Sequence, residues 1–134
     1  MNSKQNISEN QNDNYISKLK DVFEYYCQYG ERLNSRILKS HGFIKLFRES
    51  GLMDKKLNTT RLEIIYKSIN KNNQMNFDQF LNSLLKIASY KYNLSDKNDI
   101  KNATQKIILE YLFPLSNKYI KNSNIFQSNN LIKP

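Results

Sequence analysis

The sequence contains little cysteine, glycine or histidine, and each shortage excludes a class of protein. The single cysteine, Cys27, excludes an internal disulfide framework and fits a reducing compartment. The three glycines, Gly30, Gly42 and Gly51, stand alone, so no glycine-rich loop is present to hold a phosphate. One histidine, His41, and one distant cysteine are too few ligands for a metal site, and no carboxylate pair stands out from ordinary surface charge. We therefore expect no enzymatic activity, no cofactor and no metal.

Long apolar runs are also missing. No stretch approaches the roughly 20 apolar residues that span a bilayer, and the segment Met1–Asn14 lacks the apolar core of a secretory signal. We therefore expect a disordered tail over residues 1–14, no membrane partner, and a place in the cytoplasm or on the cytoskeleton.

Acidic residues are outnumbered, with 12 Asp and Glu against 21 Lys and Arg, which gives a net charge of +9. Residues 15–93 carry +7 of this charge, while residues 1–14 carry −1 and residues 94–134 carry +3. A basic excess on the part that looks folded favours an acidic partner, which could be nucleic acid, anionic lipid or an acidic protein surface. The alternative is that the charge only keeps the protein soluble.

Apolar residues recur at intervals of three and four in five segments, which predicts an all-α fold. The expected helices run from Tyr15 to Gly30, Ser40 to Gly51, Thr60 to Ile69, Asn76 to about Tyr92, and about Asp99 to Phe113. We expect one domain over residues 15–93, then a C-terminal helix and a loosely packed polar tail over residues 94–134.

Local capping signals mark several of these helix ends. Ser40 is the expected N-cap of the second helix, and Gly51 fits the position just past its end. Thr60 with Glu63 reads as a capping box for the third helix, and Asn76 with Gln79 reads as one for the fourth.

The first four helices form two helix–loop–helix units, and each loop ends in a short apolar segment. This is the layout of paired EF-hands, in which one apolar residue per loop pairs across a minimal two-strand contact. Leu38 and Met75 are the residues expected to pair. Helical hairpins unrelated to EF-hands are the alternative.

Neither loop has the ligands that calcium needs, which include a bidentate carboxylate at the twelfth position and a glycine at the sixth. Counting back from Phe43, the first loop has only Glu31 as an acid, at position one. Counting back from Phe80, the second loop has Asn70 at position three and Gln79 at position twelve, with no carboxylate among its ligand positions. We therefore expect a degenerate EF-hand-like pair that binds no calcium.

The stretch from Leu19 to Tyr92 resembles the core domain of the p25-alpha family, also called the tubulin polymerization-promoting protein family. The resemblance is carried by these segments: Phe23-x-x-Tyr26-x-x-Tyr29-Gly30, Phe43-x-Lys45-Leu46-Phe47-x-x-Ser50-Gly51-Leu52-Met53-Asp54, Thr59-Thr60-x-Leu62-Glu63-Ile64-Ile65-Tyr66-x-x-Ile69, and Met75-Asn76-Phe77-Asp78-Gln79-Phe80-x-x-Ser83-Leu84-x-x-Ile87-Ala88. Two departures stand out. The loop Asn70–Asn73 is shorter than in the family, and a helix and polar end replace the Gly- and Thr-rich tail of the long members.

The resemblance implies tubulin binding and the promotion of microtubule assembly, bundling or stabilisation, with a place in cilia, flagella or other stable arrays. It also implies an acidic partner for the basic surface, since tubulin and its tails are rich in acids. The residues expected to contact tubulin are Lys39, Lys45, Arg48, Lys55, Lys56, Arg61, Lys67 and Lys71.

Two other functions remain open on the sequence alone. One is an EF-hand-like interaction module or calcium-responsive regulator that does not act on tubulin. The other is a nucleic-acid binder, which is disfavoured because the aromatic residues fall on the apolar helix faces and not on exposed stacking platforms.

Overall fold

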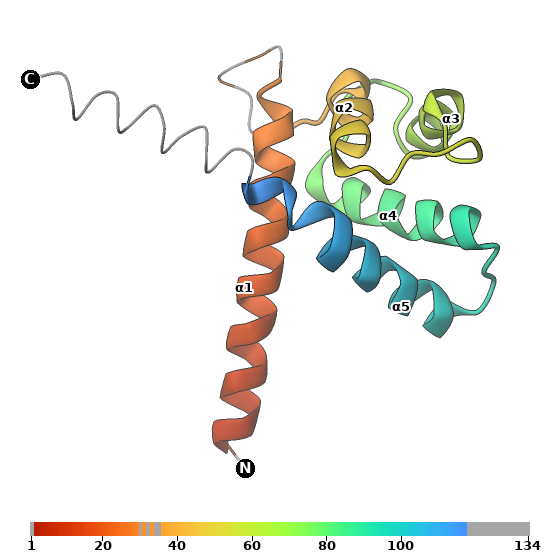
Figure 1. The fold of residues 1–134 in the computed structure, drawn as a ribbon. Helices are drawn as coiled ribbons and strands as arrows, with labels where there is room; N and C mark the ends of the chain where they lie inside the picture. Colours follow the sequence, from red (N-terminus) through yellow and green to blue (C-terminus); the bar gives the residue numbers. More distant parts are fainter. Residues whose placement is uncertain (1, 30, 32, 34–35, 118–134) are drawn as a thin grey trace, which may run out of the picture.

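The computed structural model describes residues 2–29, 31, 33 and 36–117, with the backbone alone for residues 2–13. In that part of the chain the helices are α1 (Asn2–Cys27), α2 (Ser40–Ser50), α3 (Thr59–Ile69), α4 (Phe77–Tyr92), α5 (Lys97–Ile107) and a short π-helix, η1 (Ile108–Leu112). The predicted all-α fold is confirmed. Figure 1 shows α2, α3, α4 and α5 gathered on one side of α1, beside its C-terminal half.

Helix α1 begins earlier than the apolar pattern indicates. We expected a start at Tyr15 after a disordered tail, whereas the helix begins at Asn2. The apolar stripe itself is as expected, because Leu19, Val22 and Phe23 are buried. Once packing of this stripe has formed the first turns, each further residue adds a hydrogen bond for the ordering of only that residue. The polar residues before Tyr15 can therefore continue the helix without an apolar face of their own.

The predicted start of α3 is wrong and that of α4 is confirmed. Asn58 caps α3, and not Thr60, since its side-chain oxygen accepts a hydrogen bond of 2.9 Å from the amide of Arg61. Asn76 and Gln79 form the expected capping box, in which each side chain accepts from the other's amide, at 2.9 and 3.0 Å.

The ends of α2 follow the sequence only in part. Lys39 holds the N-cap position and makes no side-chain capping bond, so the prediction that Ser40 is the cap is wrong. The amide of Ser40 donates instead to Asn73 Oδ1 in the second loop, at 2.7 Å. Gly51 ends the helix as expected, with a φ of 80° that a side chain would strain.

The two helix–loop–helix units are joined through their loops, as predicted. Leu38 and Met75 form an isolated antiparallel bridge, in which the Leu38 amide donates to the Met75 carbonyl at 2.7 Å. The buried hydroxyl of Tyr66 donates to the Leu38 carbonyl at 2.5 Å and accepts from the Met75 amide at 3.3 Å. A single side chain from α3 therefore bonds to both partners of the bridge.

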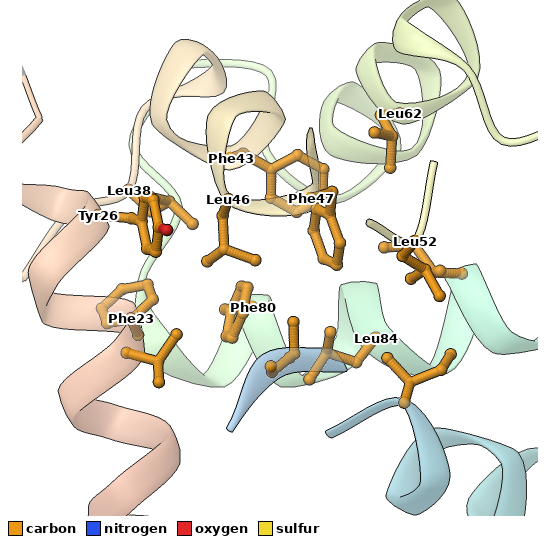
Figure 2. Packing of buried hydrophobic residues seen from close by; sticks show 14 of the residues in the cluster. Phe23, Tyr26, Leu38, Phe43, Leu46, Phe47, Leu52, Leu62, Phe80 and Leu84 are labelled. Atoms are coloured by element: carbon orange, nitrogen blue, oxygen red, sulfur yellow. The ribbon is translucent and has the colours of Figure 1, made fainter. Parts of the chain in front are cut away.

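Aromatic rings of α1, α2 and α4 meet in one hydrophobic centre (Figure 2), and Tyr66 adds a ring from α3. The Phe80 ring lies 5.4 Å from Phe23 of α1 and 6.4 Å from Phe47 of α2, measured between ring centroids. Phe43 of α2 lies 5.3 Å from Tyr66 of α3 in an edge-to-face arrangement. Burial of these large side chains is the main source of stability in a chain with a modest apolar content.

The C-terminal helix packs into the same core. Asp96 caps α5, so the helix begins at Lys97, two residues before the expected start. The helical hydrogen bonds then change to the π-helical pattern in η1, where the Phe113 amide donates to the Ile108 carbonyl five residues earlier, at 2.8 Å. The buried apolar residues of this segment are Ile107, Ile108, Leu112 and Leu115.

This packing bears on the C-terminal part in two ways. Buried residues on both sides of position 93 belong to one hydrophobic cluster. The loosely packed tail was expected to include Leu115 and Ser116, but both are buried. The rest of that tail, residues 118–134, lies outside the described residues.

Candidate interaction surface

The eight basic residues predicted to contact an acidic partner fall into two groups of four. The side chains of the first group are engaged within the protein: Lys39, Lys45, Lys56 and Arg61. Those of the second group are exposed and form no ion pair with any residue that the structure describes: Arg48, Lys55, Lys67 and Lys71. We call the second group the free bases. Of the eight, the free bases are the ones that are both exposed and without a side-chain contact that holds them within the described part of the protein.

Lys45 is tied to the core through Glu49. The Lys45 amine lies 3.2 Å from the Glu49 carboxylate, one helical turn away on α2. Glu49 also accepts a hydrogen bond of 2.5 Å from the hydroxyl of buried Tyr26 on α1. The Lys45 amine lies 4.6 Å from the centre of the Tyr29 ring as well. Lys45 therefore helps to join α2 to α1, and part of its charge is neutralised.

Lys56 and Arg61 both lie against Tyr90 of α4. The Lys56 amine is 5.0 Å and the Arg61 guanidinium carbon 4.5 Å from the centre of the Tyr90 ring. The Tyr90 hydroxyl donates to the Lys56 carbonyl at 3.2 Å, and the Lys56 amine donates to Asn93 Oδ1 at 3.0 Å. These cation–π and hydrogen-bond contacts hold the linker between α2 and α3 against the C-terminal end of α4.

Lys91 makes a second attachment of the same linker. Its amine donates to the Leu52 carbonyl at 3.0 Å and to the Asp54 carboxylate at 2.5 Å. The amide of Leu57 donates to the same carboxylate at 2.7 Å. These contacts hold the pKa of Asp54 below its usual value. The hydrogen bond from the Leu57 amide has the largest effect, and the bond from Lys91 the next largest. The linker is thus ordered, and it presents Lys55 to solvent at a fixed place.

In the second loop, amide groups fill the positions where calcium ligands would be expected. Asn70 Oδ1 accepts from the amides of Asn72 and Gln74, at 2.9 and 3.0 Å. The side-chain amide nitrogen of Asn70, Nδ2, donates to Gln79 Oε1 at 3.1 Å, so positions three and twelve of the loop bond directly to each other. Hydrogen bonds within the protein therefore order this loop, and the side-chain oxygens of Asn70 and Gln79 already have donors.

Neither Cys27 nor His41 has the surroundings of a reactive nucleophile or a metal ligand among the described residues. Cys27 is buried, and burial raises the pKa of its thiol to about 12, with a further contribution from Glu24. His41 is exposed, and its Nε2 lies 3.1 Å from the carbonyl oxygen of Tyr29. Among the residues that the structure describes, no group of three or more His, Cys, Asp or Glu side chains is placed to hold a metal ion. No helix in the described part of the chain has the length and apolar content to cross a membrane.

The sequence matches the family model described as p25-alpha over residues 20–127, which is most of the chain. The chain belongs to the p25-alpha family. The match runs from the C-terminal end of α1 past η1, so it includes all of α2, α3 and α4, both loops and the eight basic residues. The p25-alpha family is non-enzymatic and associated with tubulin and microtubules. No curated protein matched the sequence.

Sequence reasoning missed the residues that position the linker bases. Tyr90 and Lys91 contact a segment 34 to 39 residues earlier in the chain, so no local spacing rule links them to it. The one sequence feature that could have indicated these contacts is the position of Tyr90 and Lys91 in the last turn of α4, after its apolar stripe, where polar side chains can contact a neighbouring segment.

Proposed function

We propose that this p25-alpha protein binds microtubules directly and without catalysis, and that it stabilises or bundles them. The proposal is carried by one observation: a tubulin-associated family fold that leaves Arg48, Lys55, Lys67 and Lys71 exposed and without ion pairs among the described residues. These bases extend over α2, the following linker, the end of α3 and the second loop. The acidic, Glu-rich surface of tubulin has the complementary charge.

The physical mechanism is the summed attraction of several weak contacts. A single exposed ion pair contributes at most about 1 kcal/mol, so no one lysine accounts for binding. Several bases on ordered elements act together, speed up encounter and orient the protein on the polymer. Salt shortens the range of these attractions to about 8 Å at physiological ionic strength, so binding is expected to be salt-sensitive.

Co-sedimentation with assembled microtubules at rising salt tests this proposal. We expect the protein to pellet at low salt and to be released progressively as salt increases. The double substitution Arg48→Glu with Lys55→Glu is expected to weaken pelleting strongly. The matched control, Lys20→Glu with Lys106→Glu, makes the same charge change at exposed positions outside the free bases and is expected to pellet more tightly than the test variant.

Absence of pelleting by the wild-type chain at low salt would contradict the proposal outright. Equal loss in the test and control variants would show that only net charge matters, and would remove these residues from the site. Bundling requires a second contact surface or a second copy of the chain, so light scattering and electron microscopy of microtubules separate bundling from simple binding.

A further inference from the structure

A groove lies between α4 and α5, on residues that the proposed microtubule surface does not use. Its volume is about 670 Å³. The residues that line it are Leu85, Lys86 and Ser89 of α4 with Lys97, Ile100 and Lys101 of α5. None of the eight basic residues considered above is among them. This size lies within the range of protein sites that accept a ligand or the side chains of a bound peptide.

The apolar part of the groove comes from Leu85 and Ile100. Leu85 is 41% exposed although it belongs to the most strongly apolar stretch of the chain, and Ile100 is half-buried. Leucine on a solvated helix face is common by itself. Here it faces a second apolar side chain across a concave surface, which is the arrangement that takes up apolar side chains of a partner.

The rim of the groove is basic, and its charges are not balanced locally. Lys97 and Lys101 stand four residues apart on α5, and neither forms an ion pair with a residue that the structure describes. Like charges at this spacing destabilise a helix. Lys97 also lies in the first turn of α5, where the helix dipole disfavours a positive charge. The carboxylate of the N-cap residue Asp96 accepts a hydrogen bond of 3.1 Å from the Asp99 amide and forms no ion pair with a described lysine.

The third lysine of the rim is held in place. The Lys86 amine donates to Ser68 Oγ of α3 at 3.0 Å, which fixes one side of the groove relative to α3. None of the described residues that line the groove is acidic. An apolar floor bounded by three lysines therefore calls for a partner that brings apolar groups and negative charge together.

We propose that this groove binds an acidic amphipathic helix of another protein. Two apolar side chains one turn apart on that helix pack on Leu85 and Ile100, and flanking carboxylates pair with Lys97 and Lys101. A second copy of this chain is disfavoured, because its net charge of +9 would repel the same rim. Nucleic acid would satisfy the lysines but leave the apolar floor uncovered.

Fluorescence anisotropy with the full chain tests this inference. The probe is a labelled helical peptide of about sixteen Ala, Leu and Glu residues, with leucines four apart flanked by glutamates. The control peptide has serine in place of each leucine and the same charge. We expect the leucine peptide to bind roughly tenfold more tightly than the serine peptide, because only it fills the apolar floor.

Variants locate the binding on the protein. Lys101→Glu and Leu85→Ser are each expected to weaken binding of the leucine peptide roughly tenfold. Lys106→Glu, an equal charge change at an exposed position of α5 outside the groove, is expected to bind more tightly than Lys101→Glu. Circular dichroism and the unfolding temperature establish that each variant is folded, and Lys101→Gln replaces Lys101→Glu if the latter is not.

Three outcomes would overturn the inference. One is no binding of the leucine peptide by the wild-type chain, and another is equal binding of the leucine and serine peptides. The third is equal loss in Lys101→Glu and Lys106→Glu, which would indicate attraction to net charge alone. A labelled single-stranded oligonucleotide that binds in competition with the peptide, and more tightly, would assign the groove to nucleic acid instead.

Discussion

Asn73 in the second loop caps α2 of the first unit, because its side-chain oxygen accepts a hydrogen bond of 2.7 Å from the backbone amide of Ser40. Asn73 has a φ of 58°, in the left-handed region that asparagine tolerates better than most residues. The two loops are therefore joined by a side-chain cap as well as by the Leu38–Met75 bridge. Residues of the second loop thus accept hydrogen bonds from two backbone amides of the first unit, those of Leu38 and Ser40.

Replacement of Asn73 should lower stability through both of its roles. Asn73→Ala removes the cap of α2 and puts at a positive φ a residue that tolerates this region less well than asparagine, and we expect a loss of about 1 to 2 kcal/mol in the free energy of unfolding. Asn73→Gly removes the cap only, and Asn73→Asp retains an acceptor. Urea unfolding should therefore rank the stabilities Asp, then Gly, then Ala. A glycine variant as unstable as alanine would show that the backbone conformation contributes nothing.

The hydroxyl of Tyr66 should contribute more to the free energy of unfolding than the hydroxyl of an exposed tyrosine does. Tyr66→Phe leaves the Leu38 carbonyl and the Met75 amide without this partner, and we expect a loss of about 1 to 3 kcal/mol because the site is buried. Tyr92→Phe is the matched control, since Tyr92 is 41% exposed and its hydroxyl forms no hydrogen bond with a described residue. Thermal unfolding of both variants gives the comparison, and equal stabilities would contradict the structural role of Tyr66.

Charge reversal on α2 should separate binding from stability. Lys45→Glu places a second carboxylate beside Glu49 and removes an ion pair, so we expect it to lower stability by about 0.5 to 1 kcal/mol. Arg48→Glu breaks no ion pair among the described residues, and we expect weaker microtubule pelleting with little change in the unfolding temperature. The reverse pattern would place the contact at Lys45 and not at Arg48. Pelleting and thermal unfolding of the two single variants decide between these outcomes.

Stability should fall at alkaline pH partly because of Cys27. Burial raises the pKa of the thiol from its ordinary 9.0 to about 12, so between these values the unfolded chain loses a proton that the folded chain keeps. This contribution is fully present below pH 9 and decreases as the pH rises toward 12, by at most about 1.4 kcal/mol per pH unit.

Cys27→Ala isolates that effect from the titration of lysines and tyrosines, which both proteins share. Urea unfolding at pH 8 and pH 10 should show a larger loss for the wild-type chain than for the variant. Parallel losses in the two proteins would mean that the thiol titrates equally in the folded and unfolded states.

The parts of the fold that depend on short-range rules followed from the sequence. The Asn76–Gln79 capping box, the left-handed Gly51 and the apolar stripes of α1 and α4 are set by residues three or four positions apart. The start of α2 did not follow, because its capping group is 33 residues away. The start of α3 was misplaced because Asn58, Thr59 and Thr60 are all capping residues, and the linker contacts favour Asn58.

The candidate site was predicted in composition but not in detail. The sequence identifies every lysine and arginine, yet it does not reveal that Lys45 pairs with a glutamate or that Lys56 and Arg61 stack on Tyr90. Those contacts join different helices, so they appear only when the core has packed. The distinction between engaged and free bases is therefore a product of tertiary structure.

The burial of Ile107, Ile108 and Leu112 beneath α1 and α4 bears on how this chain is best divided for experiments. A fragment that stops near residue 93 would expose to water the apolar faces of α1 and α4 that this segment covers, and such a fragment is prone to aggregate. Recombinant fragments meant to behave as native protein should accordingly include η1 together with Leu115 and Ser116, which are also buried.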